Sequence, residues 1–175
     1  IDVYDGLDDI HRRRLDVRPV IAEADGRLAD WIALNTHLHD VRIGERLAGG
    51  NANVTRLVTA REGRFVLRHP PADTVSDNAA AGISREYAAI CALTGKAPVA
   101  PPIAFCDDSN VIGQPFSLTG FVEGVSITDT LPAAYGADAR QALGYSLMET
   151  LGAIHSVDPA PLLAQGFGKP EGFAV

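Results

Sequence analysis

Cysteine is scarce in this sequence of 175 residues, which contains only Cys91 and Cys106. The two cysteines lack the CxxC spacing of many metal and redox sites, and both lie in apolar segments. We therefore expect buried free thiols in a reducing cytoplasm, and neither a disulfide nor a metal site. No run of about 18 apolar residues occurs, and the charged residues 1–17 lack the apolar core of a secretory signal. These absences predict a cytoplasmic chain without a membrane partner.

An excess of basic residues is lacking as well. The chain has 15 Lys and Arg against 22 Asp and Glu, which gives a formal net charge of −7. A nucleic-acid binder needs a basic face for its phosphate contacts, so we do not expect a nucleic-acid partner. The one basic cluster, residues 12–14, is flanked by acidic residues and fits a solvated helix face. What remains is the composition of an ordinary globular protein, with 46% apolar residues and 21% charged residues.

Apolar residues at helical spacing predict three helices, over residues 25–39, 83–93 and 138–155. The last of these has the strongest pattern, a stripe of four apolar residues: Leu143, Leu147, Leu151 and Ile154. Asp138 lies at its amino end, where the helix dipole favours a negative charge. Residues 1–20 show only weak periodicity and are interpreted as an extension.

Alternating or short apolar runs predict five strands, over residues 41–48, 54–60, 64–70, 103–106 and 116–121. Tight connections join the first three, GGNAN at residues 49–53 and REGR at residues 61–64, which is typical of an antiparallel meander. The order is helix, three strands, helix, two strands, helix. We therefore predict an α+β fold, in which one helix packs on a five-stranded antiparallel sheet.

Five strings extend this pattern to a known family: GGNANVT, VLRHPP, SREYAAICAL, VIGQPFSLTGFVEG and LGAIHSVDP. In this order and spacing they resemble the aminoglycoside phosphotransferase and choline kinase group, within the protein-kinase-like fold. The nearest branch is the one found alone in bacteria and fused to acyl-CoA dehydrogenases in animals. The resemblance implies a helix-bearing N-terminal extension (1–40), a kinase-like N-lobe (41–122), and a hinge with the start of the C-lobe (123–175).

The resemblance gives the turn at residues 49–53 the task of holding the phosphates of ATP. Backbone N–H groups in a turn without bulky side chains can approach phosphate oxygens closely. Gly49 and Gly50 permit that approach, and Asn51 or Asn53 can add an amide donor. The alternative interpretation is an ordinary hairpin turn.

A single arginine, Arg68, lies within the third predicted strand. In protein kinases a lysine on this strand contacts the α- and β-phosphates and pairs with a glutamate of the next helix. The resemblance assigns these roles to Arg68 and Glu86. A guanidinium between sheet and helix needs a carboxylate partner, because an unpaired buried charge costs several kcal/mol. A purely structural ion pair is the alternative.

The resemblance places the adenine base at the hinge that follows the fifth strand. By the resemblance, the C=O of Gly120 and the N–H of Val122 bind the base, and Thr119 takes the gatekeeper position. The ceiling over the ring is assigned to three residues: Leu47, Thr55 and Val66.

Two further groups are interpreted as structural. His155 ends the last predicted helix, where the helix dipole favours a cation. Asp107 and Asp108 are adjacent carboxylates, but they lie between two predicted strands and fit a solvated turn better than a metal site.

Phosphoryl transfer also needs a catalytic loop and carboxylates that hold Mg²⁺. The family supplies the loop as HGD, and no HGD occurs in these residues. We expect the chain to be part of a longer small-molecule kinase, with the catalytic loop and the Mg²⁺ ligands beyond residue 175. The chain alone is then inactive, and a small-molecule hydroxyl is the phosphoryl acceptor. The alternatives are a non-catalytic kinase-like module that binds a nucleotide or a partner, and an α+β interaction domain without a nucleotide.

Overall fold

The computed structural model describes residues 23–47, 53–71, 77–127 and 129–167. A helix over residues 23–35 comes first. The other elements follow in the order β1 (Arg42–Arg46), β2 (Val54–Ala60), β3 (Gly63–His69), α2 (Asp77–Leu93), β4 (Pro102–Cys106), α3 (Ser109–Ile112), β5 (Phe116–Gly120), α4 (Ala137–His155) and α5 (Ala160–Leu163).

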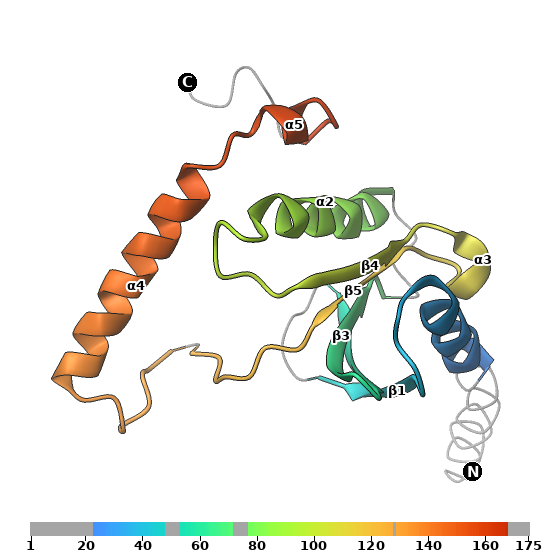
Figure 1. The fold of residues 1–175 in the computed structure, drawn as a ribbon, viewed down its shortest axis with the longest axis horizontal. Coiled ribbons are helices and arrows are strands. Elements are labelled where there is room, and N and C mark those ends of the chain that lie inside the picture. The colour runs from blue at the N-terminus through green and yellow to red at the C-terminus, as the bar shows by residue number, and fades with distance from the viewer. Residues whose placement is uncertain (1–22, 48–52, 72–76, 128, 168–175) are drawn as a thin grey trace, which may run out of the picture.

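The five strands form one antiparallel sheet in the order β1-β2-β3-β5-β4, which confirms the predicted α+β fold (Figure 1). The turn between β2 and β3 has only two residues, Arg61 and Glu62. Gly63 follows it with a φ of 143°, a value that residues with a Cβ rarely adopt. In this order β3 is the central strand, with β2 and β5 on either side, and these three strands contribute residues to the site described below.

The helix over residues 23–35 packs on one face of the sheet and closes the main core. Leu28 and Ile32 on this helix are buried against Val58 and Leu118 of the strands. Trp31 meets Phe116 edge to face, with ring centroids 5.0 Å apart. Each fully buried aliphatic side chain here contributes about 1.5–3 kcal/mol of transfer free energy. The sequence predicted this helix but not that it covers the sheet.

An ion pair ties the same helix to the sheet edge. Arg56 of β2 donates from both terminal nitrogens to Asp25, at 2.5 and 2.8 Å, and from Nε to the Gly44 carbonyl at 3.0 Å. Both charged side chains are largely buried, so the bidentate geometry is what offsets their desolvation.

Helix α2 covers the other face of the sheet, where Ile83 is fully buried (Figure 1). Tyr87 stacks on Phe105 of β4 with centroids 5.7 Å apart. Cys106 is buried as predicted, but the prediction for Cys91 was wrong, since Cys91 is exposed. Cys91 was predicted to be buried because its neighbours in the sequence are apolar. The buried side of α2 is instead the one that carries Ile83 and Ile90.

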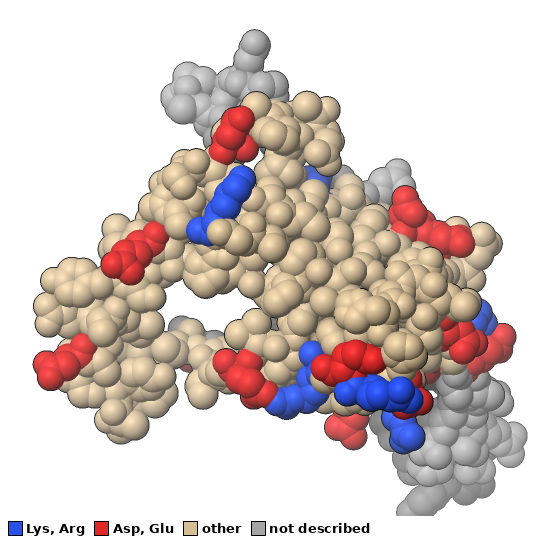
Figure 2. Space-filling model, viewed as in Figure 1, with Lys and Arg blue, Asp and Glu red and all other residues tan. Residues whose placement is uncertain are grey.

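The acidic turn and the last long helix differ in detail from the predictions. Asp107 and Asp108 are exposed as predicted, and Asp108 caps the unpredicted short helix α3 by accepting from the Asn110 N–H at 2.8 Å. Helix α4 matches the predicted range, and His155 lies in its last turn. Its apolar stripe is exposed in the part of the chain that the structure describes. Figure 2 shows a mostly uncharged surface on the visible side of α4. No helix among the described residues is long and apolar enough to span a bilayer.

Candidate functional site

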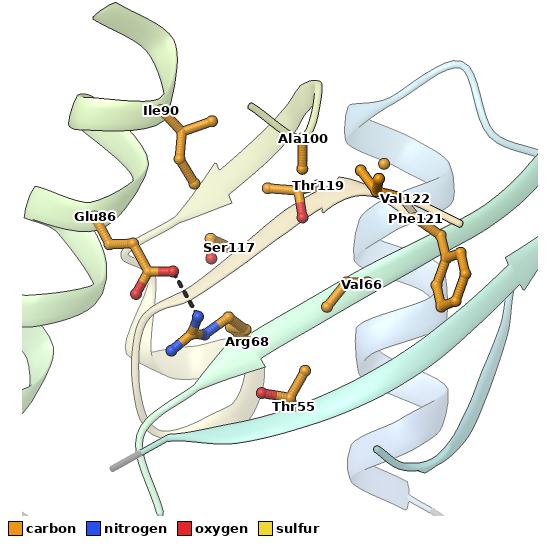
Figure 3. Close-up of a pocket in the computed structure, with 11 residues that line it drawn as sticks. Thr55, Val66, Arg68, Glu86, Ile90, Ala100, Ser117, Thr119, Phe121 and Val122 are labelled. Atoms are coloured by element: carbon orange, nitrogen blue, oxygen red, sulfur yellow. Dashed lines mark ion pairs between the residues drawn. The ribbon is translucent and has the colours of Figure 1, made fainter. Parts of the chain in front are cut away.

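A pocket of about 310 Å³ lies between α2, the middle of the sheet and the segment that follows β5. This volume falls at the low end of the range for small-molecule sites. Figure 3 shows the residues that line the pocket: Thr55, Val66, Arg68, Glu86, Ile90, Ala100, Ser117, Thr119, Gly120, Phe121 and Val122.

Strand register brings the polar residues of the pocket together. Alternate residues of a strand point to the same face, so Val66 and Arg68 share the face of β3 that is turned away from the helix over residues 23–35. Thr55 pairs with Arg68 across β2 and β3, and Ser117 pairs with Arg68 across β3 and β5. Thr119 lies opposite Val66. The four strand residues around Arg68 therefore line one continuous side of the pocket, which is formed by the sheet.

The predicted ion pair between Arg68 and Glu86 is present. Nη1 of Arg68 lies 2.8 Å from Oε1 of Glu86, and the side chains are 37% and 33% exposed. The two residues come from different elements, β3 and α2, and both face the pocket (Figure 3).

The Nε atom of Arg68 is buried and has no hydrogen-bond partner among the described residues. A buried N–H group without a partner costs roughly 1–3 kcal/mol. Arg68 therefore keeps an unused N–H donor next to the carboxylate of Glu86. An anionic ligand or an ordered water would accept a hydrogen bond from this donor.

The opposite end of the pocket is formed by the end of β5. The Gly120 N–H donates to the Pro101 carbonyl at 2.8 Å. The reciprocal bond to the Gly120 carbonyl cannot form, because proline has no N–H. A Cβ on residue 120 would lie 3.1 Å from Cδ of Pro101, so glycine lets the proline ring approach closely. The Gly120 carbonyl therefore receives no hydrogen bond from Pro101.

The segment after β5 continues the pocket wall. Phe121 and Val122 both line the cavity, and the Phe121 N–H donates to the Arg64 carbonyl at 3.0 Å. Val122 is 64% exposed, so this residue lies where the cavity meets solvent. Val122 thus lies at one end of the cavity, with Arg68 and Glu86 at the other (Figure 3). Gly120, two residues before Val122, lines the same cavity.

Some predicted site residues are not placed in the pocket. Gly49, Gly50 and Asn51 lie outside the described residues, and Asn53 lies in a bend just before β2 without lining the cavity. Leu47 does not line the described pocket, and its place in the ceiling stays a prediction. The Leu47 N–H instead donates to the Thr55 carbonyl at 2.8 Å, which extends the β1–β2 ladder.

Four lining residues were not predicted from the sequence: Ile90, Ala100, Ser117 and Phe121. Two of them had a usable signal. Ile90 lies one helical turn after Glu86, and Ser117 lies two residues before Thr119 on the same strand face. Ala100 had no such signal, because the path of the proline-rich connection decides its position.

The described residues contain no group of three or more His, Cys, Asp or Glu side chains that could hold a metal ion. The only carboxylate that lines the described pocket is Glu86, and it is paired with Arg68. The chemistry available in this cavity is therefore that of a paired guanidinium at one end and the backbone of the segment around Val122 at the other.

Comparison with known proteins identifies the family. Residues 43–174 match the phosphotransferase enzyme family. The chain belongs to this family. The match runs from β1 to beyond α5 and includes every residue of the pocket.

Relatives of this phosphotransferase family member agree with the predicted branch. The chain is 31% identical over 121 residues to acyl-CoA dehydrogenase family member 10 of Mus musculus. It is 33% identical over 127 residues to family member 11 of Gallus gallus. These alignments cover 69% and 72% of the chain but only 11% and 16% of the two relatives. The chain therefore spans a small part of the length of these relatives.

A solved structure supports the kinase-like fold. It is the crystal structure of a protein from Ralstonia eutropha assigned as an aminoglycoside phosphotransferase, with a TM-score of 0.66 and 28% sequence identity. The match covers 83% of this chain and 42% of that chain. The predicted family and fold are confirmed.

Proposed function

We propose that this chain is the ATP-binding part of a phosphotransferase that phosphorylates a hydroxyl group of a small molecule. One observation carries the proposal. A single cavity has the Arg68–Glu86 ion pair at one end and Val122 at the other, two residues after Gly120, whose carbonyl cannot accept from Pro101. An ATP molecule has complementary chemistry at its two ends, because its phosphates are anionic and its base carries an amino donor.

The base end favours adenine over guanine. Adenine presents an amino donor where guanine presents a carbonyl acceptor. The Gly120 carbonyl can accept from the adenine amino group, and the Val122 N–H can donate to the adjacent ring nitrogen. Guanine would place its carbonyl against the Gly120 carbonyl and leave both acceptors without a donor. The expected selectivity is at least about fivefold, since an unpaired buried polar group costs roughly 1–3 kcal/mol.

The phosphate end depends on Arg68. A guanidinium has five N–H donors in a planar fork, and the bond to Glu86 uses one of them. The buried Nε and the remaining donors suit a phosphate oxygen, which arginine binds with charge-assisted hydrogen bonds. The predicted phosphate turn with Gly49, Gly50 and Asn51 stays a prediction, and so does the role of Asn53.

The transfer step is proposed for the longer protein only. No HGD string occurs in the 175 residues, so we propose that the chain alone does not transfer phosphate. The described residues bring no carboxylate cluster together for Mg²⁺, and its ligands remain a prediction for residues beyond 175. The alternative function is that of a non-catalytic nucleotide-binding module, which would also bind ATP without turnover.

Titration of the protein with ATP and GTP tests the proposal. We expect ATP to bind at least about fivefold more tightly than GTP. Replacement of Arg68 by alanine should weaken ATP binding about tenfold to a hundredfold, the usual worth of a charged hydrogen bond. Equal binding of ATP by the wild type and Arg68→Ala would show that the arginine is merely structural. Mg²⁺-dependent turnover by the isolated chain would overturn the statement that it is inactive.

A further inference from the structure

One residue of β3, Arg64, holds the segment that follows β5. Its carbonyl accepts from the Phe121 N–H at 3.0 Å. Its guanidinium carbon lies 4.5 Å from the centroid of the Phe121 ring, and its Nη2 pairs with Oε1 of Glu123. Arg64 therefore contacts the two residues on either side of Val122.

Arg64 itself does not line the described pocket, whereas Phe121 and Val122 do. Residues 121–127 form neither a helix nor a strand, so no ladder or helical hydrogen bonds fix their conformation beyond the Phe121 bond. Phe121 and Val122 lie at the end of the cavity opposite the Arg68–Glu86 pair (Figure 3). Any effect of Arg64 on a ligand must therefore pass through this segment and act on one end of the cavity.

We propose that Arg64 is a positioning residue for the nucleotide base, which rests on the function proposed above. By fixing Phe121 and Glu123, it holds the Val122 N–H at the pocket entrance before the base arrives. A segment that is already ordered pays less conformational entropy on binding. The Arg64 and Glu123 side chains are 49% and 73% exposed, so each contact is weak. The expected effect is therefore about a threefold to tenfold change in affinity, and not a loss of binding.

Separate ligands for the two ends of the pocket test this assignment. Adenosine probes the base end, inorganic tripolyphosphate probes the phosphate end, and each is measured by displacement of a fluorescent ATP analogue from the protein. Arg64→Ala should weaken adenosine and ATP by the same factor, about threefold to tenfold, and leave tripolyphosphate unchanged. Arg68→Ala should do the reverse, with tripolyphosphate and ATP weakened and adenosine nearly unchanged.

Matched variants guard against a general loss of structure. Arg61→Ala removes an exposed arginine of the neighbouring turn, which pairs with Asp40 and does not contact the segment after β5, so all three affinities should stay at wild-type values. Arg64→Lys keeps a cation near Phe121 and should retain most of the adenosine affinity. Glu123→Gln removes only the ion pair, and it should weaken adenosine by less than Arg64→Ala does. This milder variant decides the question if Arg64→Ala does not fold.

The outcomes separate this assignment from the proposed function. Wild-type protein that binds none of the three ligands overturns both. Wild-type protein that binds ATP, together with an Arg64→Ala variant that binds adenosine equally well, overturns only the role of Arg64. The same holds if Arg64→Ala weakens tripolyphosphate as much as adenosine, because the change is then not confined to the base end.

Discussion

The guanidinium of Arg68 lies 2.8 Å from the carboxylate of Glu86, across the gap between the middle of the sheet and helix α2. The pair fixes the direction in which Arg68 presents its remaining donors, and the buried Nε is one of them. Because both side chains are about one-third exposed, the pair contributes little to stability by itself. Its main consequence is the placement of a cation at one end of the pocket.

Replacement of Glu86 by glutamine should weaken ATP binding more than it lowers stability. Glutamine keeps the size of the side chain, but it removes the charge that orients Arg68. We expect ATP affinity to fall about fivefold to twentyfold, with a change in the free energy of unfolding below about 1 kcal/mol. Titration calorimetry and urea denaturation measure the two effects. Glu149→Gln, on the exposed surface of α4, is the control and should change neither. A large loss of stability with intact ATP affinity would make the pair structural.

Pro101 should control the preference for adenine. Pro101→Ala introduces an N–H opposite the Gly120 carbonyl, which can then complete the hydrogen-bonded pair and compete with the base. We expect the ratio of GTP to ATP dissociation constants to fall about threefold to tenfold, the value of one neutral hydrogen bond. Competition binding with both nucleotides measures this ratio. Pro98→Ala changes an exposed proline in the same connection and should leave the ratio unchanged. An unchanged ratio for Pro101→Ala would show that the Gly120 carbonyl does not bind the base.

The helix over residues 23–35 should be needed for the stability of the sheet. Ile32 is 0% exposed in the core between this helix and the strands. Ile32→Ala should therefore lower the free energy of unfolding by about 2–5 kcal/mol, from lost transfer energy and the cavity that remains. Leu34 lies on the same helix but is 84% exposed, so Leu34→Ala should change stability by less than about 0.5 kcal/mol. Urea denaturation measures both. Equal effects would contradict the observed packing of the helix.

Glu62 should make stability depend on pH in the acid range. The His39 N–H and then the His39 ring hold the pKa of the Glu62 carboxyl at about 2, below its ordinary value of 4.5. A depressed pKa in the folded state stabilises the protein above pH 4.5, and this contribution is lost as the pH falls from 4.5 towards 2. The difference in stability between wild type and Glu62→Gln should therefore be constant at neutral pH and shrink over this window.

Denaturation curves at several pH values measure this difference. Glu45→Gln, at an exposed position of β1, is the control, because Glu45 has no ion pair among the described residues. A difference between wild type and Glu62→Gln that does not change between neutral pH and pH 2 would contradict the depressed pKa.

The sequence predicted most of the sheet, because alternating apolar residues mark each strand. In the structure, Phe65 and Leu67 of β3 lie in the core, and Val66 and Arg68 line the pocket on the other face. The family resemblance supplied the pair of Arg68 with Glu86 and the hinge. The sheet therefore needed only the period and the order of the elements, whereas the site needed the resemblance.

Other features depend on how the elements meet, which periodicity does not record. The apolar stripe with Leu28 and Ile32 showed that one side of a helix is buried, but not that the sheet buries it. Helix α3 has four residues, which is too short for a periodic signal. The contact between Arg64 and Phe121 joins residues far apart in the sequence, and no sequence motif predicts it.

A crystal structure of the protein with a non-hydrolysable ATP analogue tests the central claim most directly. We expect the adenine amino group about 3 Å from the Gly120 carbonyl, the Val122 N–H directed at the ring, and a phosphate oxygen within hydrogen-bond distance of Arg68. A nucleotide bound outside this pocket, or one in the pocket that contacts neither Gly120 nor Arg68, would contradict it.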